Sequence, residues 1–233
     1  MQPFTIFIPV YNEADILEAN VEKVISTARG LQTPFQLLLA DNGSTDATPQ
    51  LAQRLARRHG EIESFRLPRR GPGAALRRGL ELTRYDWIVT LDMDLSADLK
   101  FIAEALVLLE THDLVIGSKK TGSESRSFTR RACSDLFILM SRLLLRLPFD
   151  DYSLGAKAYR KSFLLRYRGA IDDGTAYVQT LACLAHRDAC PAIEISVDCQ
   201  DHRRSKFNLL HEGLYRFSRL FKLWIQGAPD LAP

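Results

Sequence analysis

The stretch Trp87-Ile88-Val89-Thr90-Leu91-Asp92-Met93-Asp94 joins an apolar run to two carboxylates that stand two residues apart. The apolar run predicts a buried strand. Neighbouring side chains of a strand point to opposite faces, but both carboxylates can approach one ion where the chain turns out of a sheet. Two close anions repel each other, and a divalent cation with oxygen ligands relieves that repulsion. The alternative is that Asp92 and Asp94 cap the next helix or lie solvated in a loop.

The composition is that of an ordinary globular protein, with 233 residues, 46% hydrophobic residues and a formal charge of +3. The four cysteines form no C-x-x-C pair, which gives no zinc or redox signature and favours a reducing compartment. We expect no signal peptide and no membrane span, because no basic and apolar leader and no long uncharged apolar window occur. Nucleic-acid binding is not expected, since the basic residues are dispersed.

The first half of the chain alternates between strand and helix patterns. Apolar runs predict strands at 4–10, 35–40, 62–67, 87–91 and 114–117, and helical spacing or cap signals predict helices at 13–30, 46–59, 71–83 and 98–110. Strands that are apolar on both faces predict an α/β fold with a parallel sheet between helices. In such a sheet, ligands bind outside the carboxyl ends of the strands. Three polar clusters follow predicted strand ends and can therefore build one site: Tyr11-Asn12-Glu13, Asp41-Asn42-Gly43-Ser44 and Asp92-Met93-Asp94.

The second half is less regular. Helices are predicted at 133–147, 174–187 and 207–224, and short strands at 156–159 and 192–197. We find no internal repeat and no convincing linker, so a single domain over 1–233 is favoured.

Four motifs occur in a fixed order, each after a predicted strand. They are Pro9-Val10-Tyr11-Asn12-Glu13, Asp41-Asn42-Gly43-Ser44-Thr45-Asp46-Ala47-Thr48, Gly71-Pro72-Gly73-Ala74-Ala75-Leu76-Arg77-Arg78-Gly79 and Asp92-Met93-Asp94-Leu95-Ser96. This order resembles that of family 2 inverting glycosyltransferases, which have the GT-A fold, a Rossmann-like and mostly parallel sheet with helices on both faces. The resemblance makes 1–120 the nucleotide-sugar-binding half and 121–233 the acceptor-binding half.

Two segments of the second half narrow the resemblance. The segment from Asp151 to Arg160 is similar to the D-x-x-x-G-x-x-x-Y-R pattern of dolichyl- and polyprenyl-phosphate glycosyltransferases, of which the mannosyltransferase-like group is closest. Arg203-Arg204-Ser205-Lys206 is similar to their R-x-x-G-x-S-K loop, but it lacks the glycine and is shorter. Of its arginines, we favour Arg203 for the diphosphate.

The resemblance implies roles for individual residues. Asp92 and Asp94 would hold Mg²⁺ or Mn²⁺ against the donor diphosphate, and Ser96 stands where the family often has Gln or His. The implied donor-binding residues are Pro9, Tyr11, Glu13, Asp41, Gly73, Asp92, Lys119, Arg203 and Lys206, with Asp92, Asp94 and Arg203 as the catalytic set.

Several of these residues also have an ordinary structural interpretation. Asp41 can hold an Asx turn, and Glu13 can be a carboxylate in the first turn of a helix. Gly73 can belong to a plain turn and a helix packing contact, and Lys119 to a solvated face.

The absence of a clear general base bears on which acceptor substrate the chain uses. Transfer to a hydroxyl needs a carboxylate to take the proton, and Asp172 and Asp173 are the close candidates, although a polar turn and helix cap also explain them. A phosphate acceptor is already ionised and needs only basic side chains, for which the chain offers Arg126, Arg130, Arg131, Arg203, Arg204 and Lys206. Together with the absence of a clear base, the resemblance implies inverting, metal-dependent transfer of a hexose from GDP-mannose or a UDP-sugar to polyprenyl phosphate.

Two alternatives stay open. One is transfer to a sugar or protein hydroxyl, with Asp172 or Asp173 as base, and the other is a nucleotide-sugar or phospholipid binding module without turnover. The helical spacing of 209–224, with interspersed basic residues, is typical of a helix in a bilayer interface, and equally of a last core-packing helix. The resemblance implies a cytoplasmic protein with peripheral contact to the cytoplasmic membrane face.

Overall fold

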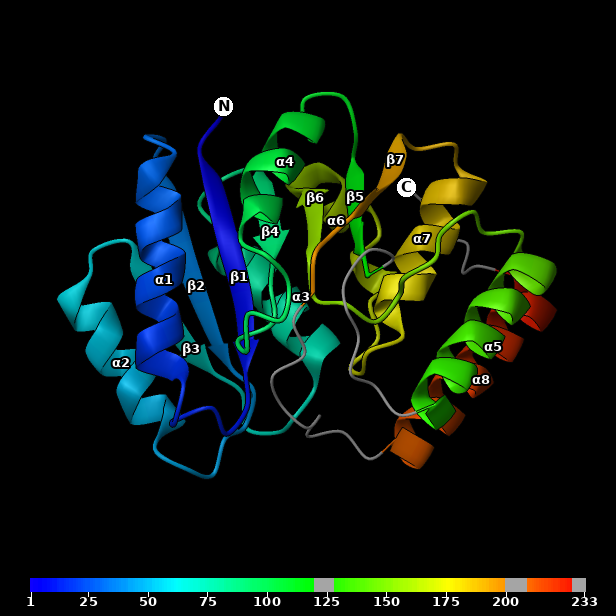
Figure 1. Cartoon of the computed structure of the whole chain (residues 1–233), viewed down its shortest axis with the longest axis horizontal. Helices are drawn as coiled ribbons and strands as arrows, with labels where there is room; N and C mark the ends of the chain where they lie inside the picture. Colours follow the sequence, from blue (N-terminus) through cyan, green and yellow to red (C-terminus); the bar gives the residue numbers. More distant parts are fainter. Residues whose placement is uncertain (120–127, 200–208, 228–233) are drawn as a thin grey trace.

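The computed structural model describes residues 1–119, 128–199 and 209–227. Its centre is a seven-stranded sheet in the order β3-β2-β1-β4-β6-β5-β7, with β6 antiparallel to both neighbours and the other pairs parallel. Figure 1 shows β1 between β2 and β4, with α1 and α4 on one side of the sheet and α3 on the other. The strands are β1 (Phe4–Val10), β2 (Phe35–Asp41), β3 (Ile62–Arg66), β4 (Trp87–Thr90), β5 (Leu114–Ser118), β6 (Lys157–Arg160) and β7 (Ala192–Ser196).

Most helices begin and end close to the expected residues. They are α1 (Leu17–Gly30), α2 (Thr48–Arg58), α3 (Pro72–Leu82), α4 (Lys100–Leu108), α5 (Phe128–Leu145), α6 (Lys161–Arg166), α7 (Tyr177–Arg187) and α8 (Leu209–Gln226), with a short 3₁₀ turn at Arg168–Ala170. The expectation for 13–30 is wrong at its start, because residues 13–16 form turns before α1. Helix α6 was not expected, since its six residues are too few to show a helical period.

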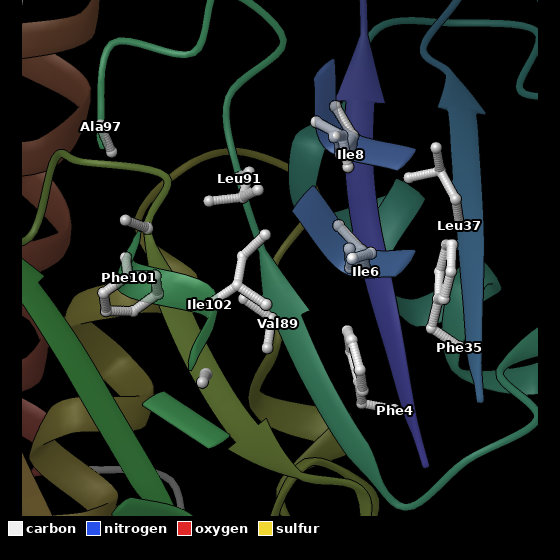
Figure 2. Close-up of a cluster of buried hydrophobic side chains, with 14 of the residues drawn as sticks. Phe4, Ile6, Ile8, Phe35, Leu37, Val89, Leu91, Ala97, Phe101 and Ile102 are labelled. Carbon is white, nitrogen blue, oxygen red and sulfur yellow. The ribbon is translucent and has the colours of Figure 1, made fainter. Parts of the chain in front are cut away.

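Two hydrophobic layers cover the sheet. Figure 2 shows the first, in which Phe4, Ile6 and Ile8 of β1 point to the same side as Val89 of β4, and Phe101 and Ile102 of α4 belong to the same cluster. The residues between them on β1 point the other way, and Phe7 packs in the second layer with residues of α3, α5, α6, α7 and α8. Burial on both faces explains why the central strands read as continuous apolar runs.

Strand β6 brings a distant segment to the end of β4. It runs antiparallel to β4, with Lys157 opposite Thr90 and Arg160 opposite Trp87. The chain therefore enters β6 at the edge where β4 ends. The turn before it, residues 151–155, therefore lies beside Asp92. If β6 were parallel to β4, the residues before it would lie at the opposite edge of the sheet.

Candidate active site

The carboxyl ends of β2, β1 and β4 lie side by side and form one edge of the sheet. β1 pairs with β2 so that Val10 stands opposite Asp41, and with β4 so that Phe7 stands opposite Thr90. The chain builds outward from β1 to β2 and β3, and then returns to place β4 on the other side. The crevice between β1 and β4 is thus a topological switch point, which is where open α/β sheets bind ligands.

Hydrogen bonds join the loop after β1 to the loop after β2. The backbone N–H of Asn12 donates to Oγ of Ser44 (2.9 Å), and Oδ1 of Asn12 accepts the N–H of Thr45 (2.8 Å). The N–H of Glu13 donates to Oγ1 of Thr48 (2.8 Å). Asn12 adopts φ 54°, a left-handed conformation that asparagine tolerates well. The two loops, which carry Tyr11, Glu13 and Asp41, are therefore joined at this edge of the sheet.

Asp41 holds the turn after β2 and also faces an arginine. Its side chain is only 2% exposed, and Oδ1 accepts the N–H of Ser44 (3.1 Å), which is the expected Asx turn. Oδ2 makes no hydrogen bond among the described residues and lies 3.1 Å from Nε of Arg66. Arg66 also donates to the carbonyl of Ser44 (2.9 Å). The carboxylate of Asp41 is a hydrogen-bond acceptor and the guanidinium of Arg66 is a donor, and the edge of a nucleobase can complement such a pair.

Tyr11 is partly buried, and the guanidinium of Arg70 lies 4.3 Å from the centre of its ring. This cation–π contact orients a flat surface at the end of β1. Sequence reasoning missed both Arg66 and Arg70. Arg66 ends β3 and Arg70 follows it closely, so their place at the end of a predicted strand was a usable signal.

Glu13 does not lie in the first turn of a helix, so that interpretation is wrong. Helix α1 begins at Leu17, whose N–H donates to the carbonyl of Glu13 (2.9 Å). Pro9, the remaining residue expected at this pocket, is partly buried near the end of β1. The donor-binding roles of both residues stay predictions.

Asp92 is held in place by the turn before β6. Its Oδ2 accepts the N–H of Gly155 at 2.8 Å. A Cβ atom at residue 155 would lie 2.3 Å from Oδ1 and 2.6 Å from Oδ2 of Asp92. Only glycine permits this approach. Burial raises the pKa of Asp92, and the neighbouring charge of Asp94 raises it further. The two carboxylates thus lie close enough to repel each other.

Asp94 sits where the chain turns out of the sheet. Its Oδ1 accepts the N–H of Ser96 (3.0 Å), and Leu95 adopts φ 50°. A leucine in the left-handed region is uncommon, and such strain tends to persist at functional sites. The interpretation of this pair as helix caps is wrong, because α4 begins at Lys100, whose N–H donates to Oδ1 of Asp98 (2.8 Å).

A buried amine lies beneath Asp92. Nζ of Lys157, on a residue only 1% exposed, donates to the carbonyls of Leu154 (2.8 Å) and Gly117 (3.1 Å). Burial lowers the pKa of Lys157 to about 8, while the charges of Asp151 and Asp92 oppose that shift. This amine ties the end of β5 to the turn that holds Asp92.

Asp151 completes this support. Its Oδ1 accepts the N–H groups of Ser153 (2.7 Å) and Leu154 (2.9 Å), and its Oδ2 accepts the N–H of Lys119 (3.3 Å). Burial favours its neutral form, but the charges of Lys157 and Lys119 and these hydrogen bonds hold its pKa below the usual value. The charge of Lys119 also lowers the pKa of Asp92, and the donor-binding role of Lys119 stays a prediction. Sequence reasoning assigned no role to Asp151, Gly155 or Lys157, although the D-x-x-x-G spacing marked them.

The carboxylate pair fits a hard divalent cation that is shared with a phosphate ligand. Among the described residues no group of three or more His, Cys, Asp or Glu side chains could cage a metal. Mg²⁺ is usually bound by one or two carboxylates, several waters and substrate phosphates. The mutual repulsion of Asp92 and Asp94 is what such an ion relieves.

Gly73 packs against a turn of the second half. Its N–H approaches the carbonyls of Asp173 (3.1 Å) and Gly174 (3.0 Å), and a Cβ there would lie 1.8 Å from the carbonyl oxygen of Asp172. The packing interpretation therefore has direct support, and donor binding by Gly73 stays a prediction. Arg203 and Lys206 lie outside the described residues, as do Arg126, Arg204 and the side chains of Arg130 and Arg131.

Sequence comparison finds related proteins along most of the chain. Glycosyltransferase AglD of Haloferax volcanii is 27% identical over 95% of this chain and 37% of its own length. Undecaprenyl-phosphate 4-deoxy-4-formamido-L-arabinose transferases of Edwardsiella ictaluri and Pseudomonas fluorescens are 26% and 30% identical, over 90% and 70% of this chain. They are matched over 64% and 49% of their own lengths, so the chain spans less than two thirds of each of these relatives.

Solved structures agree on the fold. Glucosyl-3-phosphoglycerate synthase from Mycobacterium tuberculosis, in complex with Mn²⁺, uridine diphosphate and phosphoglyceric acid, has a TM-score of 0.72 at 20% identity. The match covers 98% of this chain and 80% of that chain. The expected GT-A arrangement, a mostly parallel sheet between helices, is confirmed.

The sequence also matches the family described as Glycosyl transferase family 2 over residues 5–168, which is more than half of the chain and includes all four ordered motifs and the turn before β6. The chain belongs to glycosyl transferase family 2.

Proposed function

We propose that this chain transfers a hexose from a nucleotide-sugar donor, GDP-mannose or a UDP-sugar, to polyprenyl phosphate with inversion at the anomeric carbon. The observation that carries the proposal is the Asp92–Asp94 pair at the switch point, held by Gly155 at the same edge of the sheet as Asp41. The relatives from Edwardsiella ictaluri and Pseudomonas fluorescens are named as undecaprenyl-phosphate 4-deoxy-4-formamido-L-arabinose transferases, which supports a polyprenyl-phosphate acceptor.

In the proposed reaction, some residues bind the metal ion and others hold those residues in position. Asp92 and Asp94 hold the divalent ion, and Gly155 and Lys157 fix the position of Asp92. The ion, when bound, offsets the charge of the nucleoside diphosphate as it leaves. An oxygen of the acceptor phosphate forms a bond to the anomeric carbon while the bond from that carbon to the donor diphosphate breaks. No proton needs to be removed, because the attacking phosphate is already ionised.

The two candidate bases for a hydroxyl acceptor are engaged in other contacts. The carboxylate of Asp172 accepts the N–H of Tyr177 (3.0 Å) and the hydroxyl of Tyr215, and it lies 3.5 Å from Nε of Arg219. Asp173 is exposed and paired with Arg77. These contacts favour the phosphate acceptor over a sugar or protein hydroxyl.

A thermal-shift panel of GDP- and UDP-sugars, with and without Mn²⁺, tests the donor side. At a hundredfold excess over Kd a bound donor adds about 2.7 kcal/mol to the free energy of unfolding, which is a rise of about 5–10 °C in melting temperature. We expect one nucleotide series to stabilise the protein, only with Mn²⁺, and to lose the effect in Asp94→Asn. Sugar from the stabilising donor should then appear in the lipid phase with polyprenyl phosphate. Equal shifts for all nucleotides without metal would contradict the proposal.

The pair of helices α5 and α8 supports contact with a membrane. They pack together through the edge-to-face contact of Phe137 and Phe217, whose ring centres lie 5.3 Å apart, and Figure 1 shows them side by side at one end of the molecule. Among the side chains of the pair that the structure describes, these large apolar ones are exposed: Leu136, Leu139, Leu143, Leu214, Phe221, Trp224 and Ile225. No helix among residues 1–119, 128–199 and 209–227 is long and apolar enough to span a bilayer. An amphipathic pair of this kind can lie in the interface plane.

Replacing Leu143, Leu214 and Ile225 together by glutamine is expected to weaken binding to anionic lipid vesicles by about a hundredfold or more, because each buried leucine or isoleucine contributes about 1.5–3 kcal/mol. Co-sedimentation measures the effect. The matched control replaces Val107 of α4 and Leu165 of α6, which are exposed to a similar degree elsewhere, and should bind like the wild type. Equal binding by all three proteins would contradict the membrane contact.

A further inference from the structure

The turn 172–175 joins the second half of the chain to the site, and Asp172 is its centre. Oδ1 of Asp172 accepts the N–H of Tyr177, the first residue of α7, at 3.0 Å. Oδ2 accepts the hydroxyl of Tyr215 and lies 3.5 Å from Nε of Arg219, both on α8. One carboxylate therefore fixes the start of α7 to the inner face of α8.

Contacts around Asp172 show that this junction is tightly packed. A Cβ at Gly174 would lie 2.4 Å from the hydroxyl oxygen of Tyr215, so the tyrosine lies directly against the backbone of the turn. Nε of Arg216 donates to Oγ1 of Thr175 (3.4 Å). On its other side the turn meets Gly73 at the start of α3. The turn is thus held between α8 and the glycine-rich motif.

Tyr177 is partly buried among charged groups, one of which belongs to the metal-binding pair. Burial raises the pKa of Tyr177, and the negative charges of Asp92 and Asp172 raise it further, while Arg216 opposes them. The phenol thus lies within electrostatic reach of both aspartates and stays neutral. The N–H of the same residue is the group that Asp172 accepts.

We propose that Asp172 is a positioning residue of the transfer reaction, which fixes the start of α7 to α8 and holds both against the glycine-rich motif at the start of α3. This inference rests on the proposed function, since α8 is the helix that would carry the lipid-facing side chains. Asp172 acts through the residues that it holds and not by accepting a proton. Its side chain is only 11% exposed, and donors from two helices occupy both of its oxygens.

The test compares Asp172→Asn, Asp172→Ala, Tyr215→Phe and Arg219→Met with a matched set at the other end of α7. There Asp188 accepts the hydroxyl of Tyr167 (2.6 Å) and pairs with Arg166 (3.5 Å), so Tyr167→Phe and Arg166→Met remove the same kinds of contact away from the site. Each variant is assayed for kcat/KM toward polyprenyl phosphate, KM for the donor, metal-dependent donor hydrolysis and melting temperature.

We expect Tyr215→Phe and Arg219→Met each to lower kcat/KM for the acceptor about tenfold, the loss of one hydrogen bond to a charged group. Asp172→Ala should lose more, and Asp172→Asn, which keeps one acceptor oxygen, should lie between. Donor KM and hydrolysis should stay at wild-type values, as should all activities of the control set.

Two results would overturn the inference. A base role would be indicated by equal, large losses in both Asp172 variants with normal rates in Tyr215→Phe and Arg219→Met. A parallel fall of all activities with melting temperature would mean that the junction only stabilises the fold.

Amide exchange at Tyr177 gives a readout that needs no substrate. The exchange rate should rise at least tenfold in Asp172→Ala and Tyr215→Phe but not in Tyr167→Phe. If wild-type protein fails to transfer sugar to polyprenyl phosphate, the proposed function fails, and unchanged exchange in these variants would separately refute the link through Asp172.

Discussion

Replacing Asp94 by asparagine is expected to lower the rate of glycosyl transfer by about a thousandfold. A divalent ion supplies several kcal/mol of charge stabilisation to the departing diphosphate, and the pair Asp92–Asp94 provides all the protein carboxylates that we assign to it. Asp92→Asn should have a similar effect. Initial rates at saturating Mn²⁺ measure the loss.

The same substitution should not destabilise the metal-free protein. The raised pKa of Asp92 means that its ionised form is disfavoured in the folded state, so removal of the charge on Asp94 favours folding at neutral pH. We expect an unchanged melting temperature or a rise of about 2–4 °C for each kcal/mol gained. Asp98→Asn, which changes a carboxylate of the same loop that binds the start of α4, is the control and should keep its activity. Near-normal transfer by Asp94→Asn would rule out the assigned role.

The second large effect is expected from Gly155→Ala. The added methyl group would lie 2.3–2.6 Å from the carboxylate atoms of Asp92, closer than real contacts allow, so that carboxylate must move. Its hydrogen bond from the N–H of residue 155 is lost with the movement. A misplacement of about 1 Å at a catalytic group can lower the rate about a hundredfold, and we expect a loss of that size.

Gly60→Ala is the matched control, because a Cβ at residue 60 meets no atom within 4 Å. It should transfer sugar at the wild-type rate. Calorimetry of nucleoside diphosphate binding with Mn²⁺ separates the two glycines further, since only Gly155→Ala should weaken that binding. Normal rates and normal metal-dependent binding in Gly155→Ala would show that the turn before β6 does not control Asp92.

The first half of the fold could be predicted because short stretches of neighbouring residues determine its strands and helices. Each central strand is buried on both faces and reads as one apolar run, and each polar cluster follows a strand end. The chain order of these elements is then enough to bring Tyr11, Asp41 and Asp92 to one edge. The resemblance to a known family carried the residue roles, which the fold supports but does not test.

The second half depends on contacts that no local pattern contains. The antiparallel direction of β6 brings Gly155 to Asp92, which lies 63 positions earlier in the sequence. Asp172 looked like a candidate base because the sequence shows its carboxyl group but not Tyr215 or Arg219, which approach it from α8. The short helix α6 and the helix start at Leu17 were missed for the same reason, since tertiary contacts decide where short or weakly capped helices begin.

The most direct test of the metal-binding pair is calorimetric titration of the wild-type protein and Asp94→Asn with UDP and with GDP, each with Mn²⁺ and again with excess chelator. The wild type should bind one of these diphosphates only while Mn²⁺ is present, and Asp94→Asn should bind neither measurably. Equal affinity of the wild type with metal and with chelator would contradict the proposal that Asp92 and Asp94 bind the diphosphate through a divalent ion.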